Sequence, residues 1–356
     1  IGDWSSDVCS SDLVEYTATV PAMGYAVYRA VETKKPATTT SLVVDQKNKT
    51  IENKFLKVVI DGVTGNIASI HDKINNKEVF EKGKEGNVLQ ILEDTPKDWD
   101  AWDVDGDDMK ATPTELNSAI SVKLVENGPL KATYRIQKSY GSSQISQDIT
   151  LSADSNKVDV KLSTDWNETQ KMLKVAFPMS VSNDKATYEI GYAAIDRTTD
   201  INTSKFEVNG HKWADLTATD KSYGVSILND CKYGWNTFGN VMRLTLIKSA
   251  ADRGGNKDRG HQEMSYAIAP HAGDWKAADT VLKGYDFNYP LISQTVKSHK
   301  GDLDNKGTFG KVTSKDNNVI MTVLKKAEDS NNYIVRMYES EGKDGSTATV
   351  NLPSNI

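Results

Sequence analysis

The chain has 356 residues, of which 38% are hydrophobic and 26% are charged, and its formal net charge at pH 7 is −6. This composition is typical of a globular protein that can bury a full core. No apolar run approaches the roughly 18–20 residues that span a bilayer, and the acidic balance offers no basic stripe for a phosphate backbone, so neither membrane nor nucleic acid is expected as a partner.

Residues 1–13 read IGDWSSDVCSSDL and show neither the period of a strand nor that of a helix. They also lack the basic start and apolar core of a signal peptide. Asp3 through Leu13 match, without a mismatch, one translated reading frame of a widely used short-read sequencing adapter. We therefore interpret Ile1–Leu13 as an artefact and expect the true amino terminus to be missing; the alternative is a natural acidic leader.

Residues 14–41 are predicted to be the end of a small β domain followed by a linker. Val14–Val20 and Gly24–Arg29 are strand-like pieces on either side of a proline turn, and a Thr/Pro/Lys-rich stretch follows near residues 33–41. An isolated hairpin is marginally stable in water, so we expect the other strands of this domain to lie upstream.

Residues 42–290 are predicted to form a large antiparallel β-sandwich. Phe55–Asp61 and Ile67–Asp72 flank a glycine-containing turn. In residues 132–137 and 158–163 apolar and polar side chains alternate, which places the apolar ones on one face of a strand. Repeated strands with turn signals between them favour an all-β class with sandwich packing.

One short helix is expected near the end of this region, because Trp275, Ala278 and Leu282 fall on one helical face and Gly284 can serve as its carboxy-terminal cap. His271, just before it, is interpreted as a turn residue that holds backbone groups. Residues 291–356 are predicted to form a further β domain, truncated at its end, with strands at Val319–Leu324 and Tyr333–Tyr338.

The stretch from Asp94 to Asp108 interleaves acidic residues with Trp99 and Trp102. Carboxylate acceptors beside flat apolar faces suit a sugar. A calcium loop is a rival interpretation, but Gly106 does not stand at the sixth position of such a loop and no glutamate closes it. The favoured interpretation is a structural loop whose tryptophans pack inward.

The sequence offers no complete catalytic set and no metal site of its own. The five histidines form no HxxxH, HExxH, HxH or HxD pattern, so no metal ligands are assigned. No phosphate-binding glycine loop and no GxSxG motif is present. Cys9 and Cys231 are too few for a disulfide framework, and a single remaining cysteine suits a reducing compartment, so a cytoplasmic location is expected.

Several runs resemble, in order, the carboxy-terminal region of glycoside hydrolase family 38 α-mannosidases, most closely the cytosolic and vacuolar branch. The most specific are Asn229–Gly234 and Gly239–Leu244. The supporting runs are Trp99–Asp103, Lys174–Pro178, Ala186–Ile190, Phe206–Val208, Trp213–Leu216, Tyr266–His271 and Arg336–Glu339. Together they cover about residues 14–356.

The resemblance implies a large β-supersandwich like that of galactose mutarotases, preceded by a small β domain. It implies a retaining α-mannosidase with an aspartate nucleophile and a zinc-class divalent metal that grips sugar hydroxyls. Those residues lie in the amino-terminal part of the family, and no position here matches them. No catalytic residue and no cofactor is therefore assigned to this chain, which we expect to be inactive alone.

The resemblance leaves this chain the role of completing a substrate cleft. Asn229, Asp230, Lys232 and Tyr233 are the candidate substrate-binding residues, because their side chains can bond sugar hydroxyls; the alternative is a loop that packs against the missing catalytic domain. Arg259 is a second candidate, within Asp258–Glu263. There the chain departs from relatives, which often carry histidine at the position of Gln262 and phenylalanine at that of Met264.

The expected partners are a mannose-containing oligosaccharide and the catalytic domain of the same polypeptide, and an oligomer is possible. The alternative function is a free-standing carbohydrate-binding module without catalysis. A mutarotase-like enzyme would need a histidine and a glutamate in one cleft, a requirement that the histidine spacing leaves open.

Overall fold

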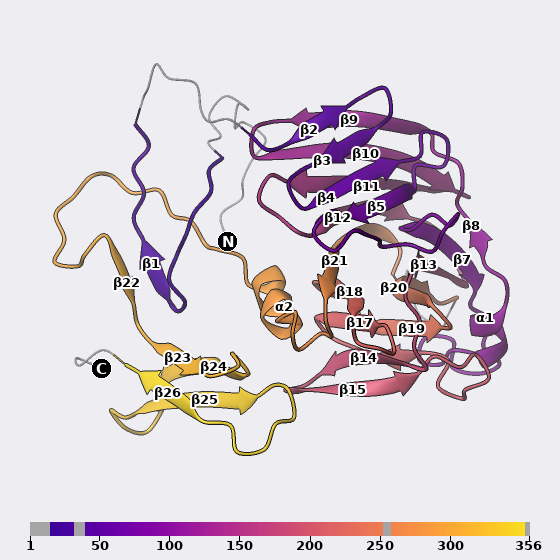
Figure 1. The fold of residues 1–356 in the computed structure, drawn as a ribbon. Helices are drawn as coiled ribbons and strands as arrows, with labels where there is room; N and C mark the ends of the chain where they lie inside the picture. Colours follow the sequence, from indigo (N-terminus) through magenta and orange to yellow (C-terminus); the bar gives the residue numbers. More distant parts are fainter. Residues whose placement is uncertain (1–14, 32–39, 252–257, 353–356) are drawn as a thin grey trace.

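The computed structural model describes residues 15–31, 40–251 and 258–352, and Figure 1 shows how its strands and two helices are arranged. The predicted artefact at Ile1–Leu13 lies outside these residues. All strand pairs are antiparallel and strands dominate, which confirms the predicted all-β class. In the described part of the chain, neither helix has the length and apolarity needed to cross a bilayer.

The largest sheet has nine strands and forms one layer of the sandwich. From edge to edge its strands are β15 (Ala193–Thr198), β14 (Lys185–Ile190), β17 (Trp213–Thr217), β18 (Tyr223–Asn229), β21 (Gly260–Ala272), β12 (Val158–Trp166), β11 (Ser143–Ser152), β10 (Lys131–Tyr140) and β9 (Ser121–Asn127).

Two further sheets pack against it (Figure 1). A six-stranded sheet contains β16 (Val208–Asn209), β19 (Gly234–Phe238), β20 (Val241–Ser249), β13 (Lys171–Pro178), β7 (Val88–Glu93) and β8 (Thr114–Glu115). A five-stranded sheet contains β2 (Val43–Asp45), β3 (Thr50–Glu52), β4 (Leu56–Ile60), β5 (Ile67–Asp72) and β6 (Lys77–Glu78).

One continuous core joins the three sheets. Val58 from the five-stranded sheet, Leu162 from the nine-stranded sheet and Val175 from the six-stranded sheet are fully buried in the same cluster. The predicted alternation is confirmed in β10, where Ala132, Tyr134 and Ile136 are buried. The inward face of each strand thus supplies the apolar area that holds the sandwich together.

The first predicted strand pair is wrong. Residues 15–20 form no strand, and β1 (Gly24–Ala26) pairs with β22 (Lys306–Thr308) near the other end of the chain. The proline turn predicts a local hairpin, but the actual partner of β1 is β22, about 280 residues further along the chain. A local sequence pattern cannot indicate such a distant pairing. The domain boundaries at 14–41, 42–290 and 291–356 stay predictions.

The opposite face of the nine-stranded sheet carries α2 (Thr280–Asn288), which lies between that sheet and the carboxy-terminal hairpins (Figure 1). Trp213 and Leu228 of the sheet, Val281 of α2 and Ile320 form one buried cluster. The hairpins pair β23 (Lys311–Ser314) with β26 (Ala348–Asn351) and β24 (Val319–Lys326) with β25 (Tyr333–Glu339). The two predicted strands of this region are confirmed as β24 and β25.

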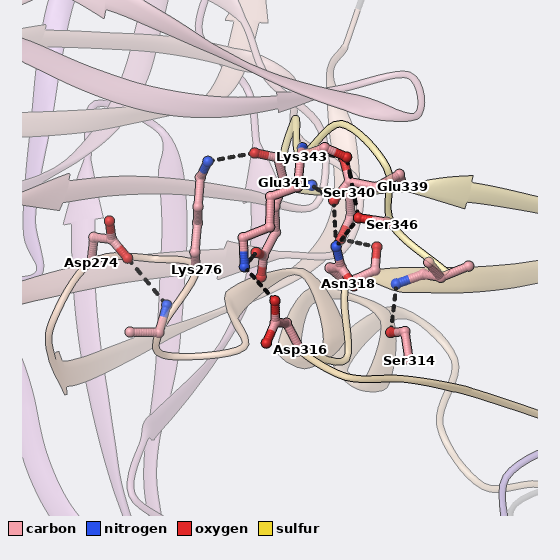
Figure 2. A network of polar contacts seen from close by, with 12 residues as sticks. Asp274, Lys276, Ser314, Asp316, Asn318, Glu339, Ser340, Glu341, Lys343 and Ser346 are labelled. Carbon is pink, nitrogen blue, oxygen red and sulfur yellow. Dashed lines mark hydrogen bonds and ion pairs between the residues drawn. The ribbon is translucent and has the colours of Figure 1, made fainter. Parts of the chain in front are cut away.

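Polar contacts also fasten these hairpins to the turn before α2 (Figure 2). The Lys276 ammonium donates to the backbone carbonyl of Glu341. The Lys343 ammonium lies 2.7 Å from a Glu341 carboxylate oxygen and 3.1 Å from one of Asp316. Helix α2 and the hairpins therefore form one unit on the outer face of the sheet.

Two predictions about the helix region are wrong. Gly284 lies inside α2, not after it, and an added Cβ there would lie 2.8 Å from Cδ1 of Trp213. His271 lies in β21, and its Nε2 is 2.8 Å from Oδ2 of Asp215. The roles of Gly284 and His271 are thus set by contacts with Trp213 and Asp215 of β17, which are distant from them in sequence.

Candidate functional site

A cavity of about 470 Å³ opens where the end of β18, the segment before β17 and the end of α2 meet. Its lining is polar and aromatic, and it consists of His211, Lys212, Asn229, Asp230, Tyr233, Asn288 and Tyr289. The cavity thus includes three of the predicted substrate-binding residues.

Asn229 builds the cavity wall. Its side chain is buried at 1% exposure and donates from Nδ2 to the His211 carbonyl at 2.5 Å. Its Oδ1 accepts from the backbone N–H groups of Cys231 and Lys232, which closes a tight turn. Because these bonds occupy the amide oxygen, Asn229 positions the loop, and little of its side chain is left for a ligand.

Asp230 presents the carboxylate of the cavity. Its Oδ2 accepts from the Ser265 backbone N–H at 3.0 Å, and its own N–H donates to the Ser265 carbonyl at 3.1 Å. The residue is exposed, so its carboxylate can still accept hydrogen bonds from ligand hydroxyls. Burial, and then the adjacent Asp230, raise the pKa of the Cys231 thiol, which therefore stays protonated at neutral pH.

Lys212 also lines the cavity, and its side chain is fixed by Glu189. Its Nζ lies 2.7 Å from Oε1 of Glu189, and its backbone N–H donates to Oε2 of the same carboxylate. Burial lowers the pKa of Lys212, but the Glu189 bond and charge outweigh it, so the net pKa is raised. Lys212 is therefore a positive charge with a set position.

Aromatic rings form the rest of the lining. Tyr233 is 57% exposed, and its ring meets that of His211 edge-on at 5.4 Å. Tyr289, 67% exposed, stacks on Tyr285 at 5.9 Å. Asn288 donates to the Asn229 carbonyl at 3.0 Å and so ties α2 to the same wall. Flat faces beside fixed polar groups suit a ligand that has both C–H and O–H surfaces.

The structure brings only part of the predicted site together. Lys232 takes part in the Asn229 turn through its backbone, and its side chain is not among the lining residues. Arg259 donates to the Thr169 hydroxyl, just before β21 begins. Ser265 bonds Asp230 and so marks the position of the cavity along β21. Arg259 precedes Ser265 by six residues, which corresponds to about 20 Å of extended chain between Arg259 and the cavity. Contact of these residues with substrate stays a prediction.

The sequence interpretation missed His211, Lys212, Asn288 and Tyr289. The first two precede β17 and the others end α2, so only the folded chain places them beside Asp230. Lys212 does directly precede the recognisable run Trp213–Leu216, which is the one sequence signal that pointed to this neighbourhood.

The acidic loop at Asp94–Asp108 differs from its favoured interpretation. Trp99 and Trp102 are 68% and 80% exposed, so they do not pack inward. The apolar contact is made instead by Met109 of α1 (Gly106–Lys110), which packs on Leu92 and Met172. In the described residues, no three His, Cys, Asp or Glu side chains come close enough to hold a metal ion.

Two family profiles match the chain. Residues 51–253 match the glycosyl hydrolases family 38 C-terminal domain, and residues 318–356 match the glycosyl hydrolases family 38 C-terminal beta sandwich domain. The fold is similar to that of a family 38 glycosyl hydrolase from Enterococcus faecalis, with a TM-score of 0.75 at 16% identity, over 90% of this chain and 41% of that one.

Curated relatives are similar in sequence. Alpha-mannosidase G of Dictyostelium discoideum is 36% identical over 86% of this chain and 28% of its own length. Human alpha-mannosidase 2C1 is 30% identical over 91% of this chain and 32% of its own length. The chain therefore spans about a third of the length of these relatives.

Proposed function

The chain belongs to glycosyl hydrolase family 38, since that family's C-terminal domain covers residues 51–253, and we propose that it is the carboxy-terminal, cleft-completing part of an α-mannosidase. The proposed substrate of the whole enzyme is a terminal α-mannoside of an oligosaccharide. A free-standing carbohydrate-binding module is not favoured, because the sequence relatives are named α-mannosidases.

The cavity around Asp230 supports this proposal most directly. Asp230 supplies a carboxylate acceptor, Lys212 a fixed donor, and Tyr233 and Tyr289 two exposed rings around about 470 Å³. This volume lies within the usual range for small-molecule sites, which is about 300–1,000 Å³. A mannose ring offers hydroxyls to the polar groups and a C–H face to a ring.

The residues of this chain bind and orient in the proposed mechanism. We assign Asp230 and Lys212 to hydroxyl contacts, Tyr233 and Tyr289 to the sugar face, and Asn229 to holding the loop. Retention by way of an aspartate nucleophile is proposed for the whole enzyme, and the nucleophile has no counterpart here. Such binding contributes to rate by fixing the sugar relative to catalytic groups outside this chain.

A zinc-class metal belongs to the proposal for the whole enzyme. The described residues do not fit such a site, because no cluster of three suitable ligands occurs among them. No reaction step is assigned to the metal in this chain. A catalytic domain of the same polypeptide is the proposed partner, and a cytoplasmic location stays part of the proposal.

Two assays on the purified chain test this function together. The first is hydrolysis of an aryl α-mannoside with added zinc or cobalt, and no turnover is expected. The second is calorimetric titration with methyl α-mannoside, for which weak binding is expected. Metal-dependent turnover by the chain alone would overturn the non-catalytic assignment, whereas the absence of binding would overturn the role of the cavity.

A further inference from the structure

Trp99 and Trp102 form an exposed aromatic pair on the loop that follows β7. Their side chains are 68% and 80% exposed, and their ring centroids lie 5.7 Å apart. By contrast, Trp166, Trp213 and Trp235 are fully buried. A tryptophan side chain can bury about 150–250 Å² of surface, so leaving two of them in water forgoes considerable stabilisation.

The sandwich holds this loop in place at its base. Both carboxylate oxygens of Asp94 accept from the Lys248 ammonium at 2.6 Å, and Asp94 is fully buried. Burial raises the pKa of Asp94, against the opposing effect of Lys248. Asp108 accepts from the backbone N–H of Thr95 at 2.8 Å. Met109 of α1 is buried against Leu92 and Met172 and so holds α1 on the sandwich.

The tip of the loop is also fixed. Oδ2 of Asp100, between the two tryptophans, accepts from the Ala251 backbone N–H at 2.8 Å, beyond the end of β20. The N–H groups of Trp102 and Asp103 both donate to the Trp99 carbonyl, at 2.7 and 2.8 Å. Trp99 adopts φ +57, a conformation that costs an L-residue roughly 1–2 kcal/mol. The exposure of the rings is thus a property of an anchored loop.

The surroundings of the pair indicate which ligand it suits. In the sequence Asp98 directly precedes Trp99 and Asp103 directly follows Trp102, and both are exposed, while the half-buried Asp100 stands between the two tryptophans. Carboxylates accept hydrogen bonds from hydroxyls and repel anionic ligands. A flat apolar face bordered by such acceptors suits a neutral pyranose, whose C–H face stacks on the ring and whose hydroxyls donate to the acids.

We propose that Trp99 and Trp102 form a second carbohydrate-binding platform, which takes a neutral sugar residue of an α-mannose oligosaccharide. The identity of the sugar rests on the proposed function. The platform shares no residue with the cavity around Asp230, and it lies on the β7–β8 connection, whereas that cavity lies at the ends of β18 and α2. The platform and the cavity can therefore bind either two parts of one oligosaccharide or two separate oligosaccharides.

The test uses the full chain labelled with 5-fluorotryptophan and titrated with an α-linked mannotriose, followed by ¹⁹F NMR. Trp99→Phe and Trp102→Phe assign the two resonances among the seven tryptophans. The expected result is a saturable shift of these two resonances in the millimolar range. The paired change Asp98→Asn and Asp103→Asn, which leaves the Asp94 and Asp108 anchors intact, is expected to weaken binding about tenfold.

Asp230→Asn separates this proposal from the proposed function. The shifts of Trp99 and Trp102 are expected to persist in that variant, even where binding in the cavity is lost. The absence of any saturable shift in the native chain overturns the platform. Equal shifts with maltotriose overturn its assignment to mannose oligosaccharides, and loss of the shifts in Asp230→Asn overturns its independence from the cavity.

Discussion

Nδ2 of Asn229 donates to the backbone carbonyl of His211 at 2.5 Å and thereby ties the end of β18 to the segment that leads into β17. The Oδ1 atom of the same side chain accepts from the N–H groups of Cys231 and Lys232. One buried amide thus shapes two walls of the candidate site, because Asp230 follows it and Lys212 follows His211.

Asn229→Ala is expected to lower the free energy of unfolding by about 2–4 kcal/mol, since buried backbone groups lose their partners. Urea denaturation followed by circular dichroism measures this change. The matched control is Asn202→Ala, at an exposed turn, where a change within about 0.5 kcal/mol is expected. Equal effects of the two substitutions would contradict the structural role of Asn229.

Gly284→Ala is expected to destabilise the protein because the new methyl group would lie 2.8 Å from the buried ring of Trp213. Overpacking costs about 1–3 kcal/mol, and the better helix propensity of alanine recovers at most about 1 kcal/mol. Thermal unfolding measures the difference. Gly191→Ala is the control, because an added Cβ there meets nothing within 4 Å. A more stable Gly284→Ala variant would show that α2 packs differently.

These examples show how far the sequence predicts the fold. Strands β10 and β12 follow from the alternation of apolar and polar residues, because a strand's inward face is a local pattern. Gly284, His271 and the pair Trp99 and Trp102 were misinterpreted for the same physical reason. Their roles depend on Trp213, on Asp215 and on the anchors Lys248 and Ala251, which are distant in sequence.

The candidate site also combines residues that a local sequence run indicates with residues that only the folded chain brings together. Asn229, Asp230 and Tyr233 lie in one recognisable run, and a run can be interpreted without the fold. Lys212 enters only because β17 pairs with β18, so that its backbone carbonyl accepts from the Asn229 N–H. Tyr289 enters only because the end of α2 bonds the Asn229 carbonyl through Asn288, and Arg259 lies just before β21 begins, outside the cavity. Proximity in sequence therefore predicted the loop but not the cavity.

Lys138 is expected to make stability depend on pH. It is buried, with Nζ 2.5 Å from Oδ1 of Asn66 and 2.8 Å from the Leu116 carbonyl, and burial lowers its pKa from 10.5 to about 8. Between these two pH values the unfolded chain binds more protons than the folded one. The free energy of unfolding therefore rises with pH in this window, by roughly 3 kcal/mol in total for this group.

Denaturant titrations of the native chain and of Lys138→Met, at several values between about pH 7 and about pH 10, isolate this contribution. Relative to the variant, the native chain is expected to gain stability as the pH rises. Lys123→Met, an exposed lysine on β9, is the control and is expected to give a curve parallel to the native one. Parallel curves for Lys138→Met would contradict the lowered pKa.

Tyr338 is expected to hold the hairpin of β24 and β25 against the sandwich. Its hydroxyl lies 3.3 Å from that of Tyr285, and its ring meets Tyr192 edge-on at 5.3 Å. Tyr338→Ala should speed amide exchange in β25 by about tenfold or more, whereas Tyr333→Ala, at an exposed residue of the same strand, should leave it nearly unchanged. Hydrogen exchange read by mass spectrometry makes this comparison, and unchanged protection in Tyr338→Ala would place the docking contacts elsewhere.

The most direct test of the central claim is the affinity of methyl α-mannoside for the native chain and for Asp230→Asn. The substitution keeps an acceptor for the Ser265 N–H but removes the charge that faces the cavity. A hydrogen bond to a charged group is worth about 1.5–3 kcal/mol, so a loss of roughly tenfold or more in affinity is predicted. Asp220→Asn, an exposed aspartate outside this cavity, is the control and should bind as the native chain does. Equal affinity in all three proteins would contradict the assignment of the Asp230 cavity to mannoside binding.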